Sequence, residues 1–136
     1  MKRTIASIIA FMALLDGVIS VAGTPCSVVG AVCGFTTSIP LTQFQISLNQ
    51  PVDVGSVDAT DFTVNGIPPV AVSIINGNTT LDFTYTTSPV VPGTNIMHIA
   101  AGAFNCDGGP VQEFTCRFRY IPSTSALTPS PPQTSL

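Results

Sequence analysis

Four cysteines and a single histidine are the residues of this chain best suited to chemistry. Cys26, Cys33, Cys106 and Cys116 could hold zinc or form two disulfides. Zinc sites commonly use closely spaced Cys-x-x-Cys pairs, and the sequence has none; its histidine, His98, is also distant from every cysteine. The cysteines are therefore predicted to form a disulfide framework, with no metal and no cofactor.

Four cysteines allow three disulfide pairings. Pairing of sequence neighbours would join Cys106 to Cys116, but a hairpin over residues 101–116 would separate them by more than about 15 Å. That separation exceeds the limit of about 7 Å between the Cα atoms of a disulfide, although a path other than a hairpin would remove the objection. We favour Cys33–Cys116 with Cys26–Cys106, because the first and last strands of a sandwich often lie side by side.

A catalytic triad would need His98 as its base. His98 lies in a predicted strand that shows it to solvent, and no Gly-x-Ser-x-Gly motif supplies a nucleophile. We therefore expect a surface or structural histidine and no enzymatic activity. A small hydrolase is the least favoured hypothesis, since it requires His98 in a cleft beside a hydroxyl or a carboxylate.

Three carboxylates, Asp53, Asp58 and Asp61, lie close together in sequence and could offer oxygen ligands to calcium. Their spacing matches no calcium loop, and aspartates in turns usually accept hydrogen bonds from their own backbone. We predict that all three aspartates stabilise turns through such backbone hydrogen bonds and do not bind calcium.

Residues that could bind a sugar or a protein are few. The sequence has no tryptophan, and Tyr85 and Tyr120 fall on the predicted inner faces of strands. Arg117 and Arg119 share one face of the last predicted strand. An adhesive surface could use them, but we expect solvated cations that discourage pairing between strand edges.

The chain begins with two cations followed by an apolar run and small residues. This pattern predicts a secretory signal peptide over residues 1–22, cleaved after Ala22. An uncleaved membrane anchor is the alternative, which Asp16 and Gly17 disfavour. We therefore expect a secreted or cell-surface protein with no membrane attachment after cleavage, in a compartment that permits disulfides.

Composition narrows the range of partners. Charged residues make up 8% of the chain and the net charge is −3. No basic patch is present for nucleic acid, and no polybasic segment for an anionic membrane. The partner is predicted to be an unknown protein or a cell-surface glycan.

Alternation of apolar and polar residues predicts strands. It is clear over residues 43–48, 81–86 and 114–120, and less clean over 70–75 and 95–100. Residues 61–64 could form a short strand, and the apolar run over residues 28–35 could be a first strand. Asn76-Gly77-Asn78 predicts a hairpin turn. One helical turn is expected near residues 57–61, with Ser56 as its cap.

These segments predict an all-β protein: an Ig-like antiparallel β-sandwich of about seven strands over residues 23–121. A closed barrel is the alternative. Residues 122–136 are rich in proline, serine and threonine, which predicts a disordered tail or a linker.

Five segments resemble the bacterial Ig-like domain of the S-layer (SbsA) type: Gln43–Asp53, Ser56–Val64, Ile99–Phe104, Asp107–Val111 and Phe114–Phe118. The resemblance covers about residues 28–121, and the cysteines are an addition to that family's pattern. It implies a spacer, stalk or accessory module with no catalytic residues. The function predicted from the sequence is thus a non-catalytic structural or adhesive module, the alternative being a ligand- or carbohydrate-binding module that uses loops at one end of the sandwich.

Overall fold

The computed structural model describes residues 23–31 and 33–124. The predicted signal peptide and most of the predicted tail lie outside the described residues. The described part is all-β, and none of its helices has the length and apolarity needed to cross a membrane.

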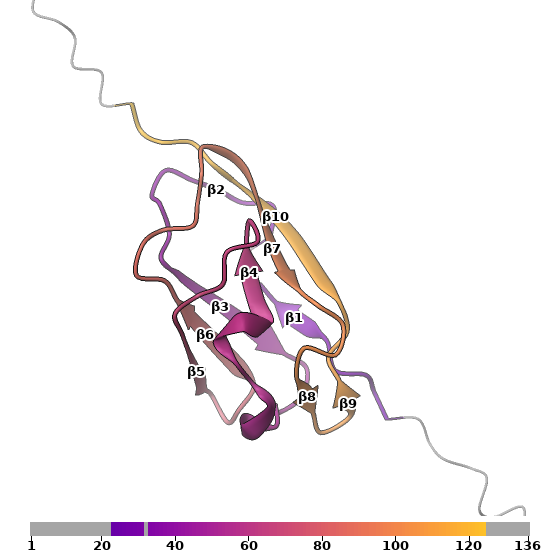
Figure 1. Ribbon diagram of the computed structural model, residues 1–136. Coiled ribbons are helices and arrows are strands. Elements are labelled where there is room, and N and C mark those ends of the chain that lie inside the picture. The colour runs from indigo at the N-terminus through magenta and orange to yellow at the C-terminus, as the bar shows by residue number, and fades with distance from the viewer. Residues whose placement is uncertain (1–22, 32, 125–136) are drawn as a thin grey trace, which may run out of the picture.

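Ten strands and two short 3₁₀ turns make up the described chain (Figure 1). The strands are β1 (Val28–Gly30), β2 (Thr36–Thr37), β3 (Gln43–Leu48), β4 (Phe62–Val64), β5 (Ala71–Ile75), β6 (Thr80–Thr84), β7 (Gly93–Ile99), β8 (Asn105–Cys106), β9 (Gly109–Pro110) and β10 (Phe114–Tyr120). The 3₁₀ turns are η1 (Val54–Ser56) and η2 (Ala59–Asp61).

The strands form two four-stranded sheets and one short hairpin. The first sheet has the order β1-β3-β6-β5, the second has the order β2-β10-β7-β4, and β8 pairs with β9. Every pair of strands is antiparallel except β2 with β10, which is parallel. The second sheet is therefore mixed, which corrects the expectation of a purely antiparallel structure.

The parallel pair arises because the single strand predicted over residues 28–35 is two strands in different sheets. β1 pairs with β3, whereas β2 pairs with β10. Between them Gly34 has a φ of +71°, in the left-handed region that glycine adopts readily, so the chain can turn from one sheet to the other.

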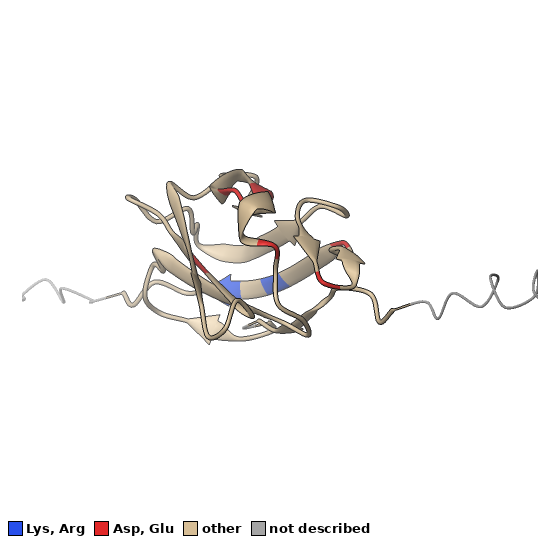
Figure 2. Cartoon of the chain, turned by 90° about the horizontal axis from the view of Figure 1, so that it is seen from below, with Lys and Arg blue, Asp and Glu red and all other residues tan. Residues whose placement is uncertain are grey.

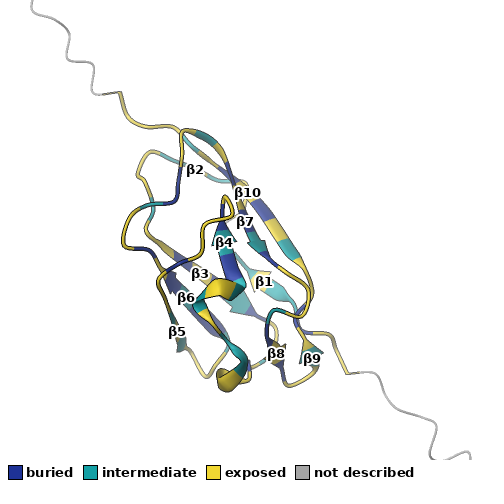
Figure 3. Cartoon of the chain, viewed as in Figure 1, coloured by how far each residue is buried: buried dark blue, intermediate teal, exposed yellow. Residues whose placement is uncertain are grey.

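The core lies between the two sheets (Figure 3). In β3 the even-numbered residues Phe44, Ile46 and Leu48 are buried, as the alternation predicts. The ring of Phe62 in the second sheet lies 4.6 Å from that of Phe83 and 5.9 Å from that of Phe44, both in the first sheet. These contacts show that the sheets pack face to face and share one core.

The local turns agree with the sequence in part. Residues 76–78 form the predicted hairpin turn between β5 and β6, and all three have positive φ. The predicted helical turn is instead two 3₁₀ turns, and the second is capped by Asp58, not Ser56.

The described chain enters and leaves the fold at opposite ends. Figure 1 shows the described chain beginning near the β8–β9 hairpin and ending beyond β10, on the side of β2. The long axis of the molecule therefore runs between the two points where the described chain begins and ends.

Candidate functional site

The N-terminal end is fixed by a disulfide between Cys26 and Cys106, whose Cα atoms are 5.8 Å apart. Both cysteines are buried. The Gln112 N–H donates to the Cys26 carbonyl at 2.9 Å, and Cys26 forms an isolated bridge with Val111. We call this disulfide and its backbone contacts the N-terminal clamp.

Two polar side chains of the turn after β3 reinforce the N-terminal clamp. Asn49 accepts a hydrogen bond from the Ser27 N–H at 2.9 Å and donates to the Pro25 carbonyl at 2.8 Å. Gln50 donates to the Thr24 carbonyl and accepts from the Gly108 N–H. Neither role is predicted above, because the partners of Asn49 and Gln50 are distant in the chain.

The C-terminal end is fixed by the disulfide between Cys33 and Cys116, with Cα atoms 5.6 Å apart. Around it the Gly34 N–H donates to the Arg117 carbonyl at 2.8 Å, and the ring of Phe35 stacks on that of Phe118 at 5.1 Å. We call this arrangement the C-terminal clamp; it ties the chain before β2 to the last long strand.

The disulfides are the long-range pairs that the sequence analysis favours. Their setting differs from the expectation in one respect: Cys33 is exposed and lies between β1 and β2, not at the end of a strand. Cys116 is buried in β10, as its alternation with exposed arginines indicates.

His98 lies on β7 with its side chain 40% exposed. Its Nε2 is 3.3 Å from a carboxylate oxygen of Glu113, which is itself largely exposed. His98 lines none of the hollows of about 50, 340 and 490 Å³ in the described part of the chain. The geometry is that of an exposed histidine–carboxylate contact, which typically contributes little to stability.

The three clustered aspartates make local hydrogen bonds. Asp53 accepts from the Gly55 N–H, and Asp58 and Asp61 form a capping box around η2. Hydrogen bonds from Thr60 lower the pKa of Asp58, whereas burial raises the pKa of Asp61. Among residues 23–31 and 33–124, no group of three or more His, Cys, Asp or Glu residues is placed to hold a metal ion.

The two tyrosines point inward, as predicted. Tyr85 is buried, accepts from the Val64 N–H at 3.1 Å and donates to the Ile67 carbonyl at 2.8 Å. Burial raises the pKa of Tyr85 to about 12, while the hydrogen bond from Val64 acts in the opposite direction. Tyr120 is half-buried against the core.

The two arginines lie on the exposed face of β10, on the surface of the second sheet (Figure 2). β10 has β7 on one side and β2 on the other, so it is not an edge strand. The predicted role of Arg117 and Arg119 in guarding an edge is therefore wrong.

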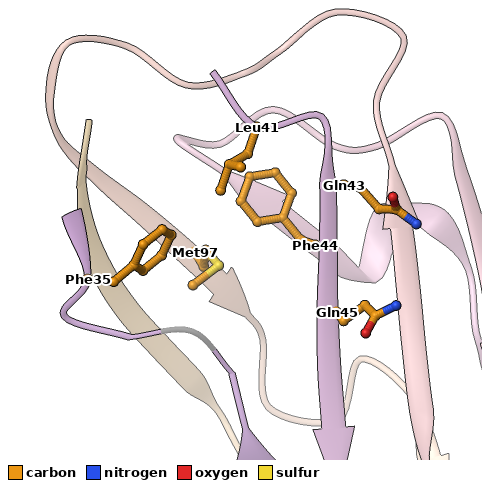
Figure 4. Close-up of a pocket in the computed structure, with 6 residues that line it drawn as sticks. All are labelled: Phe35, Leu41, Gln43, Phe44, Gln45 and Met97. Carbon is orange, nitrogen blue, oxygen red and sulfur yellow. The ribbon is translucent and has the colours of Figure 1, made fainter. Parts of the chain in front are cut away.

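A small apolar cavity is lined by Phe35, Leu41, Phe44, Met97 and the backbone side of two glutamines (Figure 4). Gln43 and Gln45 point away from it. Its volume is about 50 Å³, whereas ligand pockets usually measure about 300–1,000 Å³. It is too small for a sugar.

Two larger hollows are shallow and open to solvent. One of about 340 Å³ lies beside Arg117 and Arg119, with Thr36 and Thr94 on its wall. Another of about 490 Å³ lies at the C-terminal end between residues 36–38 and 121–124. Both are surface depressions, and neither is lined by the carboxylate or histidine side chains that would support acid–base catalysis.

Comparison with known proteins points to one kind of neighbour. No family model matches the sequence, and no curated protein does. Three solved structures match over 85% of this chain, each with a TM-score of 0.53: the N-terminal part of the bacterial S-layer protein SbsC at 19% identity, the fragment rSbsC(31-844) at 19%, and SbsC domains 1–6 at 18%.

At this level of identity the likeness concerns the fold. This chain spans 26%, 15% and 16% of those three structures, so it corresponds to a fraction of each. The fold is thus similar to that of part of an S-layer protein. This agrees with the resemblance to S-layer domains, although the SbsA type itself is not among these three neighbours.

Proposed function

We propose that this chain is a non-catalytic structural module of a secreted or cell-surface protein, in which it acts as a rigid spacer. The observation that carries the proposal is the placement of the two chain ends at opposite poles, with one disulfide at the N-terminal end and the other on β10, the strand that leads to the C-terminal end. A module so arranged keeps the structures attached to its two ends apart. The similarity to S-layer protein folds supports a surface location, and disulfides support an oxidising one.

The finer assignments complete the proposal. The module over residues 23–121 is an Ig-like sandwich of the S-layer (SbsA) type, preceded by a signal peptide over residues 1–22. Residues 122–136 act as a linker. Its contacts are with another protein or a cell-surface glycan, and it needs no cofactor.

A second candidate is a ligand-binding module. The observation that favours it is the open hollow of about 340 Å³ beside Arg117 and Arg119, which would accept an anionic or polar group. The hollow lies on a sheet face and not among the end loops that the sequence analysis considered.

Two measurements test the spacer. The full chain with a C-terminal tag, produced in a bacterial host, should be recovered outside the cytoplasm, begin at Gly23 and yield the two disulfide-linked peptides on non-reducing digestion. Recovery of the reduced, full-length chain in the cytoplasm would contradict the proposal. Labels at residues 24 and 123, attached without cysteine chemistry, should give one narrow distance distribution by electron spin resonance; a broad distribution would rule out rigidity.

A further inference from the structure

The two disulfides cross along the sequence. Cys26 bonds to Cys106, and Cys33, which lies between those two, bonds to Cys116, which lies beyond them. A crossed pair differs from a nested pair because every stretch of chain between the bonded cysteines is covalently connected to both clamps.

Three separate stretches of backbone therefore each connect the two clamps covalently: residues 26–33, 33–106 and 106–116. The shortest, 26–33, spans at most about 25 Å when fully extended. While both disulfides are intact, the clamps cannot move further apart than this, whatever happens to the non-covalent contacts. Strands β2 to β7 lie in the long stretch, whereas β1 lies in the shortest stretch and β10 contains Cys116.

Tension on a spacer is applied at its ends. The chain reaches the N-terminal clamp three residues after Gly23, and it leaves the C-terminal clamp at Cys116, eight residues before Thr124. Pulling on these ends loads the N-terminal clamp directly and the C-terminal clamp through residues 117–120 of β10, which pair with β7 and β2.

We propose that the crossed disulfides make this module a tether of limited length, in which strands β2 to β7 are shielded from load; this rests on the spacer function proposed above. Without the disulfides, residues 26–116 would extend to about 300 Å. Cys33–Cys116 alone limits the path between residues 26 and 116 to about 25 Å, and Cys26–Cys106 alone limits it to about 35 Å. The two bonds are redundant, so loss of either one leaves the tether short.

Single-molecule force spectroscopy tests the tether. The full chain carries one handle directly before Gly23 and another after Leu136, and it is produced by export so that the disulfides form. Four forms are pulled: the wild type, Cys26→Ser with Cys106→Ser, Cys33→Ser with Cys116→Ser, and all four serine substitutions. We expect a large lengthening, about 300 Å less the folded distance, only in the last form.

A large lengthening in the oxidised wild type, or in either form that keeps one disulfide, overturns the proposal. If the four-serine form does not fold, dithiothreitol is added to the wild type under load, where it reduces each disulfide to two thiols. The large lengthening should then appear only after both bonds are reduced; its appearance after the first reduction would overturn the redundancy.

A matched control shows that the fold itself yields at the forces used. With handles at Ser38 and Gly77, both exposed and inside the long stretch, the oxidised wild type should lengthen by up to about 130 Å. The pulling experiment and the export experiment can fail separately. A short tether in a protein that stays in the cytoplasm would refute only the proposed function. A long extension in an exported protein would refute only the tether.

Discussion

The Nδ2 of Asn65 donates a hydrogen bond to the Oδ1 of Asn95 at 2.7 Å, and through this pair the loop before β7 is tied to the end of β4. Asn95 is fully buried, and its amide makes three further hydrogen bonds, to the N–H and the carbonyl of Val91 and to the carbonyl of Gly93. Because both the oxygen and the nitrogen of this buried amide are hydrogen-bonded, the side chain fixes the path of the loop around it.

Replacing Asn95 should therefore be costly. Asn95→Ala leaves the Val91 N–H and the Asn65 amide without their acceptor and opens a small cavity at a buried position, so we expect a loss of about 2–4 kcal/mol in the free energy of unfolding. Urea denaturation measures it. The control is Gln112→Ala, because Gln112 is exposed and its side chain makes no hydrogen bond in the described part; a similar loss in the control would contradict the assigned role.

Stability should fall at alkaline pH because of Tyr85. Its pKa is about 12 in the folded protein and about 10 when the chain is unfolded, so the unfolded state releases the proton first. The contribution of Tyr85 is complete below pH 10 and is lost as the pH rises from about 10 to about 12.

The check on Tyr85 is denaturation at several pH values. Tyr85→Phe should weaken the decline between about pH 10 and 12, at the cost of a lower stability at neutral pH, since the Val64 N–H loses its acceptor. Tyr120→Phe, which removes the other tyrosine, serves as the control. An unchanged decline in the Tyr85 variant would show that another group causes it.

The two disulfides should stabilise the fold in a non-additive way. The first bond closes a loop of about 80 residues in the unfolded chain, whereas the second closes only the ring formed by segments 26–33 and 106–116. Loop-closure entropy then gives a loss of about 3 kcal/mol for either bond alone and about 7–8 kcal/mol for both. Urea denaturation of the three serine variants measures this, and reduced wild type controls for the substitutions. A double loss no larger than the sum of the single losses would contradict it.

The strands with clear alternation were predictable because each is set by local pattern. The buried residues of β3 and β10 are those that the period of two selects. The change of sheet between β1 and β2 was not predictable in this way. It depends on contacts distant in sequence, such as the hydrogen bond from the Arg119 N–H to the Phe35 carbonyl, which give residues 36–37 their place beside β10.

The clamps were predictable only as cysteine pairs. Simple geometry favoured the long-range bonds, but the polar contacts of Asn49 and Gln50 involve partners more than twenty residues away and leave no local signal. The cap of η2 does leave a local sequence signal. Asp58 and Asp61 have the spacing of a capping box, which identifies Asp58 as the cap.

Gly108 should be required for the N-terminal clamp. A Cβ atom at this position would overlap the Thr24 carbonyl oxygen and the Gln50 side chain, so Gly108→Ala must displace the link that holds the first residues of the module. We expect a loss of about 1–3 kcal/mol, as for other overpacked sites, and faster proteolysis near residue 24 while the Cys26–Cys106 bond remains intact. Gly55→Ala is the matched control, because Gly55 also lacks a positive φ and its Cβ would meet only Asp53 Oδ1, at an ordinary 3.6 Å. Equal losses in the two variants would mean that glycine is needed for general backbone reasons and that the Gln50 link does not secure the end of the chain.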